Sequence, residues 1–178
     1  MPLISAKSDF PQEVDALTAL HYQPLEQRYL DDLYTLWSDP AVIRYTGIPQ
    51  PCTREQARHK LLCLQQSDGF VILQQHTFVG IIGCPAIDRE TEQFGLFYQL
   101  KPDFWHQGYA TAAVGWMLNF MKEKYSHPIL YADVITANTA SEAILRHFHF
   151  ICQSQSEPIH YAGTPAVIRH YKLRLREQ

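Results

Sequence analysis

The 178-residue chain lacks the marks of several protein classes. No apolar run approaches the roughly 18 residues that a membrane-spanning helix needs. The first residues, MPLISAKSDF, contain no basic segment followed by a long apolar run, which is the pattern of a secretory signal. The net charge of -3 leaves no basic excess to neutralise a phosphate backbone. We therefore expect a cytoplasmic protein that binds neither membranes nor nucleic acid.

Cysteine is scarce, and none of the four cysteines forms a CxxC pair. Zinc sites and redox motifs usually need such pairs, so we expect no metal site. Free thiols in a reducing compartment are the simplest interpretation of Cys52, Cys63, Cys84 and Cys152.

The chain has the length of one domain, and no repeat, low-complexity run or linker divides it. Residues 1–16 are mixed and polar and are expected to form a loose arm. Apolar spacing predicts helices over 25–37, 53–66, 108–125 and 139–147, with a short helical turn over 40–45. Alternating or continuous apolar runs predict strands over 17–22, 70–75, 78–87, 92–100, 129–134, 150–156 and 167–174. Residues 157–166 read as a loop. This order indicates an α/β (α+β) domain with one mixed sheet of about seven strands flanked by about four helices.

The stretch FWHQGYATAAVGW, residues 104–116, places a glycine where a strand-like run gives way to a helical pattern. The first N–H groups of a helix have no partner within it and attract anions. Gly108 would let the backbone approach a phosphate closely, and Ala110 keeps the next turn small. An ordinary strand-to-helix turn explains the same spacing, so the residues alone leave both readings open.

Four motifs in order make the sequence resemble a known family. The segment from Trp105 to Thr111 is similar to the acetyl-CoA pyrophosphate loop of GNAT N-acetyltransferases, above all those of the RimJ/RimL type. SDPAVIRY (38–45), TREQA (53–57) and NTAS (138–141) are similar to three further segments of that branch. The resemblance covers nearly the whole chain.

This resemblance implies a GNAT fold, largely antiparallel, with a V-shaped split between the fourth and fifth strands. It implies acetyl-CoA as acyl donor, bound in that split. The backbone near Gln99 and Leu100 would pair with the pantetheine arm, and Asn138 would lie against it. The pyrophosphate would bind at His106, Gln107, Gly108, Tyr109, Ala110 and Thr111.

Catalytic roles follow less directly. The resemblance makes Ser141 the donor of a proton to the leaving thiolate. The residues alone also fit a simpler reading, in which Asn138 or Thr139 caps the last helix and Ser141 belongs to its first turn. The base that takes a proton from the amine is unassigned; Glu92, at the start of the central strand, is one candidate, and Glu157 and His160 in the closing loop are others.

The chain departs from the branch at two informative positions. Ala112 stands where a glutamate is usual, and His149 stands where a glycine usually ends the last helix. Histidine tolerates the left-handed conformation better than most residues, so we expect that turn to survive.

The resulting expectation is an N-acetyltransferase in which a primary amine, from a protein N-terminus or a small molecule, attacks the acetyl group directly in a ternary complex. The alternative is an acyl-CoA-binding module or sensor with weak or no catalysis, suggested by the missing carboxylate at Ala112. A homodimer is left open by the sequence.

Overall fold

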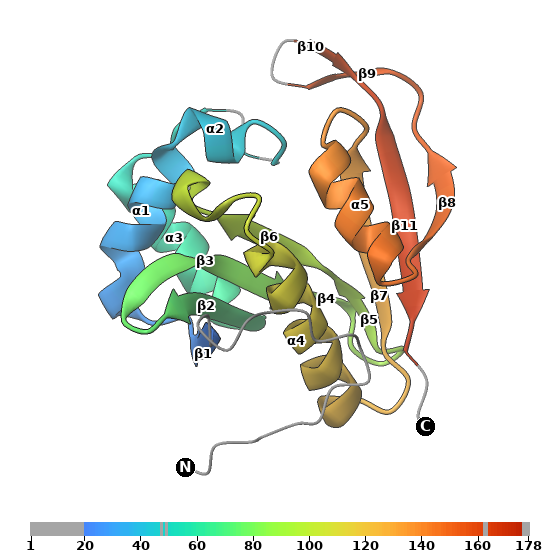
Figure 1. The fold of residues 1–178 in the computed structure, drawn as a ribbon, viewed down its shortest axis with the longest axis horizontal. Coiled ribbons are helices and arrows are strands. Elements are labelled where there is room, and N and C mark those ends of the chain that lie inside the picture. Colours follow the sequence, from blue (N-terminus) through green and yellow to red (C-terminus); the bar gives the residue numbers. More distant parts are fainter. Residues whose placement is uncertain (1–19, 47, 49, 162–163, 176–178) are drawn as a thin grey trace.

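The computed structural model describes residues 20–46, 48, 50–161 and 164–175, and this part contains eleven strands and five α-helices (Figure 1). The strands are β1 (Leu20–Pro24), β2 (Asp68–Gln74), β3 (Thr77–Cys84), β4 (Ala86–Asp88), β5 (Gln93–Gly95), β6 (Phe97–Leu100), β7 (Ile129–Ile135), β8 (Ile151–Gln155), β9 (Ile159–Tyr161), β10 (Thr164–Ala166) and β11 (Ile168–Arg174). The helices are α1 (Leu30–Ser38), α2 (Pro40–Ile43), α3 (Arg54–Leu64), α4 (Tyr109–Lys124) and α5 (Thr139–His147). The expected arm, 1–16, and the start of the first expected strand lie outside the described residues.

The expected mixed α/β fold is confirmed, but the sheet is divided in two. One sheet has the order β1-β2-β3-β6 and is antiparallel throughout. The other has the order β4-β5-β7-β11-β8 and contains one parallel pair, β5 with β7. The strand count exceeds the expected seven because two predicted strands are interrupted and a hairpin is added.

The division falls inside the strand predicted over 92–100, which breaks at Leu96. β5 pairs with β7, and the Leu96 N–H still donates to the Tyr131 carbonyl oxygen at 2.7 Å. Beyond that bond β6 pairs only with β3, so its other edge separates from β7. This is the V-shaped split expected between the fourth and fifth strands, and it is confirmed.

Helix starts follow their capping residues. Thr53 caps α3 in a full capping box with Gln56, as the TREQA segment predicts. α1 begins later than predicted, at Leu30, after a 3-10 turn over Gln27–Tyr29. Asp31 and Asp32 stand in its first turn, where the helix dipole favours acidic groups.

The end of α5 shows how histidine fits at position 149, where glycine is usual in the branch that the sequence resembles. His149 has φ 61, in the left-handed region, and its N–H donates to the Arg146 carbonyl oxygen at 3.0 Å. The Phe150 N–H donates to the Leu145 carbonyl oxygen at 2.9 Å, completing the closure of the helix. The expected turn therefore survives with histidine in place of glycine.

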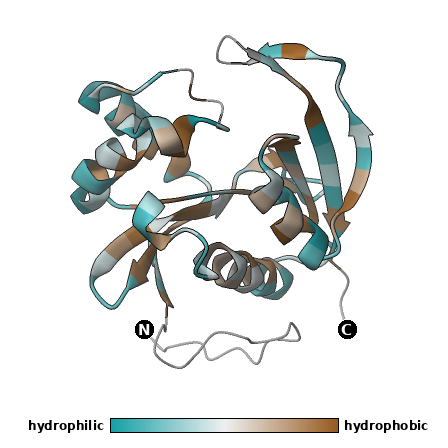
Figure 2. Cartoon of the chain, turned by 45° about the horizontal axis from the view of Figure 1, so that its top comes forward, coloured by the Kyte–Doolittle hydropathy of each residue, from teal (hydrophilic) through white to brown (hydrophobic). Residues whose placement is uncertain are grey.

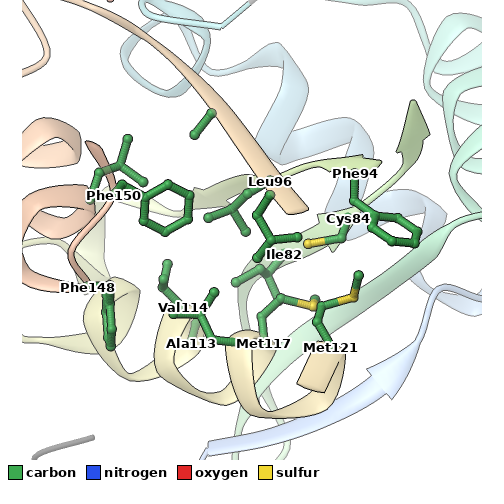
Figure 3. Close-up of a cluster of buried hydrophobic side chains, with 14 of the residues drawn as sticks. Ile82, Cys84, Phe94, Leu96, Ala113, Val114, Met117, Met121, Phe148 and Phe150 are labelled. Atoms are coloured by element: carbon green, nitrogen blue, oxygen red, sulfur yellow. The ribbon is translucent and has the colours of Figure 1, made fainter. Parts of the chain in front are cut away.

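Two buried clusters lie on opposite faces of the first sheet. On one face, α1, α2 and α3 pack on β2 and β3 around residues such as Leu33, Trp37 and Ile81. On the other, α4 packs its Val114, Met117 and Met121 side chains toward both sheets, as Figure 3 shows. In Figure 2 both α4 and the strands beside it carry brown, apolar segments. Helices therefore cover both faces of the first sheet.

The loop predicted over 157–166 instead contains the β9–β10 hairpin, in which Ile159 pairs with Ala166. The hairpin extends beyond the N-terminal end of β11, on the same side of the molecule as α2 (Figure 1). Within the described residues, no helix is both long and apolar enough to cross a bilayer.

Candidate active site

A cavity of about 880 Å³ occupies the split between the sheets. Its walls come from β6, from β7 and from the N-terminal ends of α4 and α5, and it reaches α1, α2 and α3 on the far side of β6. Most of the residues predicted for the site line it: Gln99, Leu100, His106, Gly108, Tyr109, Ala110, Thr111, Asn138 and Ser141. The fold therefore brings together segments that lie more than forty residues apart in the sequence.

The N-terminus of α4 forms one end of this cavity. Gly108 is the N-cap residue, with φ 81, and no side chain in the described part of the chain caps the helix there. The first bond of the helical ladder runs from the Ala112 N–H to the Gly108 carbonyl oxygen at 2.9 Å, so the preceding N–H groups have no partner within the helix. A Cβ built on Gly108 would meet no described atom within 4 Å. The cradle is therefore open toward the cavity and suited to an anion, which fits the pyrophosphate of acetyl-CoA.

Two side chains brace the loop before this helix. The Trp105 indole N–H donates to the Leu100 carbonyl oxygen at 2.9 Å, and the Gln107 amide donates to the Asp103 carbonyl oxygen at 2.7 Å. His106 has φ 57 between them. The Gln107 side chain is thus directed at the protein, and Gln107 is absent from the cavity lining, unlike the other predicted loop residues.

The free edge of β6 forms the next wall. The Lys101 N–H donates to the Val79 carbonyl oxygen at 2.9 Å, so by antiparallel alternation Gln99 also points its backbone groups at β3. Tyr98 and Leu100 then point theirs into the split, although the Leu100 carbonyl is already used by Trp105. Of the backbone near Gln99 and Leu100, which was predicted to pair with the pantetheine arm, the Tyr98 groups and the Leu100 N–H are therefore the ones that face the split.

Tyr98 and Ser141 meet across the cavity. Their hydroxyl oxygens lie 2.8 Å apart. Burial raises the pKa of Tyr98 to about 12, with the Ser141 hydrogen bond acting in the opposite direction, so the phenol is neutral at physiological pH. Sequence reasoning had little basis for selecting Tyr98, because an aromatic residue on the apolar face of a strand is usually part of the core.

Asn138 is the N-cap of α5, and its side-chain oxygen accepts from the Ser141 N–H at 3.2 Å. Thr139 and Glu142 have the spacing of a capping box, but no such box forms, because Asn138 is the N-cap. Glu142 instead accepts hydrogen bonds from Arg146, Arg169 and Tyr171 at 2.6, 2.5 and 2.6 Å. These bonds, with that of Tyr171 first, lower the pKa of the buried Glu142 carboxyl to about 2. This network ties the first turn of α5 to β11 and so fixes Ser141.

The three candidates for the base lie away from this centre. Glu92 is not part of the cavity lining, and its carboxylate accepts hydrogen bonds from the Ser126 and His127 N–H groups at 3.3 and 2.5 Å. Glu157 and His160 are exposed and do not line it either. The structure therefore does not support Glu92 as the base, because its carboxylate is held in the turn between α4 and β7.

The opposite side of β6 has a different character. The Trp37 indole N–H donates to the Gln99 side-chain oxygen at 2.7 Å. The Lys60 ammonium lies 5.3 Å from the centre of the Trp37 ring. Arg44, Tyr45 and Phe97 line the same part of the cavity. The described residues contain no group of three or more His, Cys, Asp or Glu side chains placed to hold a metal ion.

Comparison with known proteins identifies the family. A sequence model of the Acetyltransferase (GNAT) domain matches residues 20–151. The chain belongs to the GNAT acetyltransferase family. It is therefore an acetyl-CoA-dependent acetyltransferase, with acetyl-CoA as its acyl donor, as the motifs predicted.

Individual relatives agree with the assignment. The GNAT chain is 27% identical over 139 residues to the uncharacterized N-acetyltransferase p20 of Bacillus licheniformis, covering 74% of this chain and 78% of the relative. An acetyltransferase of Salmonella typhimurium that modifies the N-terminal serine of 50S ribosomal subunit protein L7/L12 has a TM-score of 0.76 at 17% identity, covering 90% and 96% of the two chains.

A spermidine N-acetyltransferase of Vibrio cholerae, in complex with CoA and spermine, has a TM-score of 0.75 at 15% identity, covering 87% of this chain and 95% of the other. Both enzymes share the GNAT fold with this chain. The Salmonella enzyme acts on a protein N-terminus, whereas the Vibrio enzyme acts on a polyamine. The same fold thus serves different acceptor amines.

Proposed function

We propose that this GNAT protein transfers the acetyl group to a primary amine, which attacks it directly in a ternary complex. The observation that carries the proposal is the pair of hydroxyl groups of Tyr98 and Ser141, 2.8 Å apart in the split between β6 and β7. Acetyl-CoA supplies an acetyl group activated as a thioester. The protein must position the two reactants, donate hydrogen bonds to them and move the proton.

The cradle and the edge of β6 position the donor. The N–H groups at the start of α4, with bare backbone at Gly108, would hold the pyrophosphate. The Tyr98 backbone and the Leu100 N–H would pair with the amide groups of the pantetheine arm. Asn138 uses its side-chain oxygen in the cap, which leaves its amide N–H groups to donate into the cavity.

The hydroxyl pair can move the proton without any of the three predicted bases, which lie away from this centre. Formation of an amide and a thiol moves one proton from the nitrogen to the sulfur. A hydroxyl group both donates and accepts, so Tyr98 and Ser141 together can take the proton that the amine loses and give one to the departing sulfur. Because burial keeps Tyr98 protonated, the pair begins the reaction with a donor in place.

The acceptor would approach from the α1–α3 side of β6. Trp37, Tyr45 and Phe97 line that part of the cavity and offer aromatic walls. An α-amino group has an ordinary pKa of about 7.7–8.0, against about 10.4 for a lysine side chain. A protein N-terminus or another amine of low pKa therefore suits a site that has no strong base.

The test is release of free thiol from acetyl-CoA with a panel of peptides and small amines, followed by mass detection of the acetylated product. Thiol release that depends on the amine supports the proposal. Tight binding of CoA, with neither thiol release nor a mass increase of any amine, would instead support an acyl-CoA-binding module.

A further inference from the structure

Two basic side chains face the acceptor side of the cavity from different helices. Lys60 is half-buried on α3, beside the Trp37 ring. Arg44 follows α2, is exposed, and holds its guanidinium carbon 5.1 Å from the centre of the Tyr45 ring. Both residues line the cavity on the face of β6 that also carries Gln99. An acceptor that reaches the split from this side therefore passes two cations.

Neither cation is neutralised by an acidic side chain in the described part of the chain. The ion pairs there involve other basic residues, including Arg54 on the same helix as Lys60, which pairs with Asp31 at 2.5 Å. Burial lowers the pKa of Lys60, as expected for an ammonium group that has lost water without gaining a carboxylate partner.

Acidic residues are almost absent from the walls themselves. The only carboxylate among the described lining residues is Asp133 on β7, and it lies 2.7 Å from the Nδ1 atom of His170. A second hollow, between α2 and the β9–β10 hairpin, shares Arg44 and Tyr45 with the cavity and has no acidic residue in its described lining. A polyamine would bring further ammonium groups to this region and be repelled.

We propose that the acceptor carries a carboxylate a few bonds from its reactive amine, and that Lys60 and Arg44 bind this carboxylate. The proposal rests on the proposed transferase function and adds the charge of the acceptor. An acidic amino acid and a polypeptide with an acidic residue next to its N-terminus present the same chemistry. Basic side chains recognise carboxylates through charge-assisted hydrogen bonds, with arginine able to form two at once.

The experiment compares three peptides that differ only at the second residue, which is Glu, Gln or Lys, together with free glutamate and spermidine. Both acetyl transfer and binding to the CoA-saturated protein are measured, so that the result does not depend on turnover alone. We expect the Glu peptide to exceed the Lys peptide by about tenfold in both affinity and kcat/KM, the scale of one or two partly exposed ion pairs. Spermidine should have the lowest affinity and the lowest kcat/KM of the five compounds. The rate with free glutamate, compared with that of the Glu peptide, distinguishes a small-molecule acceptor from a polypeptide.

Variants that reverse or remove a charge show which residues cause the preference. Arg44→Glu should abolish or invert the preference for the Glu peptide, and Lys60→Met, which keeps an aliphatic chain beside Trp37, should reduce it. Arg58→Glu is the matched control, because Arg58 is exposed on α3 and lines neither hollow. The affinity for CoA should be unchanged in all three variants.

Two results would overturn the proposal. The first is equal binding and equal transfer for the three peptides, which leaves the transferase function intact. The second is a weaker affinity for CoA in Arg44→Glu or Lys60→Met with the peptide preference unchanged, since the cations would then serve the donor. Failure of the proposed function looks different: the peptides bind with the expected preference and no acetyl group is transferred.

Discussion

Replacement of Gly108 tests the anion cradle most directly, because its two consequences can be calculated separately. The residue has φ 81, which costs a non-glycine residue about 1–2 kcal/mol. A new Cβ would meet no described atom within 4 Å, so no packing clash adds to this cost. For a domain of this size each kcal/mol lowers Tm by about 2–4 °C. All Gly108 variants should therefore remain folded, with Tm lower by only a few degrees.

The effect on the donor should be much larger for a charged side chain. A carboxylate about 4 Å from a phosphate is repelled by about 1 kcal/mol in water and about 4 kcal/mol near a protein surface. It also removes the anion-binding value of the helix N-terminus, about 0.3–1 kcal/mol. We expect Gly108→Glu to weaken CoA binding by about 3 kcal/mol, or roughly 100-fold in Kd.

Gly108→Gln separates charge from bulk, since it has nearly the same shape as Gly108→Glu. It should weaken CoA binding by about tenfold, as a side chain placed in the approach to the N–H groups would. Isothermal titration with CoA at low and at high salt measures both variants, and the difference between them should shrink at high salt. An unchanged Kd for Gly108→Glu, with the small fall in Tm observed, would show that the pyrophosphate does not bind at α4.

Three further predictions concern the neighbouring parts. Tyr98→Phe and Ser141→Ala should each lower kcat by about 100-fold with the Kd for CoA unchanged. The double variant should lose little more activity than either single variant, because the two hydroxyls act as a unit, and additive losses would refute the relay. Tyr22→Phe, outside the cavity, is the control. Glu142→Gln should cost about 1–3 kcal/mol of unfolding free energy. The pKa of Glu142 in the folded protein is lowered to about 2, so this stabilisation is complete above the unfolded pKa and is lost as pH falls toward 2. The difference in unfolding free energy between the native protein and Glu142→Gln should therefore vanish in acid. A difference that stays constant with pH in denaturant titrations would contradict this. Gly80→Ala should cost about 1–3 kcal/mol, because its Cβ would lie 2.2 Å from the Gln99 carbonyl oxygen, and an unchanged Tm would show that β3 and β6 separate freely.

Local signals in the sequence predicted local structure well. The capping box at Thr53 marked the start of α3, and the left-handed turn at His149 formed as its residue type allows. Both outcomes depend on interactions within a few residues, which a sequence displays directly. Gly108 at the start of α4 was visible in the same way, but its spacing fitted both an anion site and an ordinary turn, and only the family resemblance favoured the anion site.

Interactions between distant segments were not visible in this way. The alternation from Phe94 to Leu100 is continuous, so it predicted one strand, whereas the chain changes partner at Leu96. A period of two residues reports which face each side chain occupies and carries no information on the neighbouring strand. The contact of Tyr98 with Ser141, 43 residues away, depends on that change of partner and could not be predicted.

Side-chain alternation along β6 explains how one short strand would contact both substrates in the proposed arrangement. Tyr98 and Gln99 are neighbours, so their side chains point to opposite faces of β6. Tyr98 reaches Ser141 on the face covered by α4 and α5, and Gln99 reaches Trp37 on the face covered by α1 and α3. A slip of one residue in the pairing of β6 with β3 would exchange the two faces and separate both contacts. The register of this pair, which Gly80 permits through its close approach to Gln99, would therefore set where the proposed donor and acceptor sites meet.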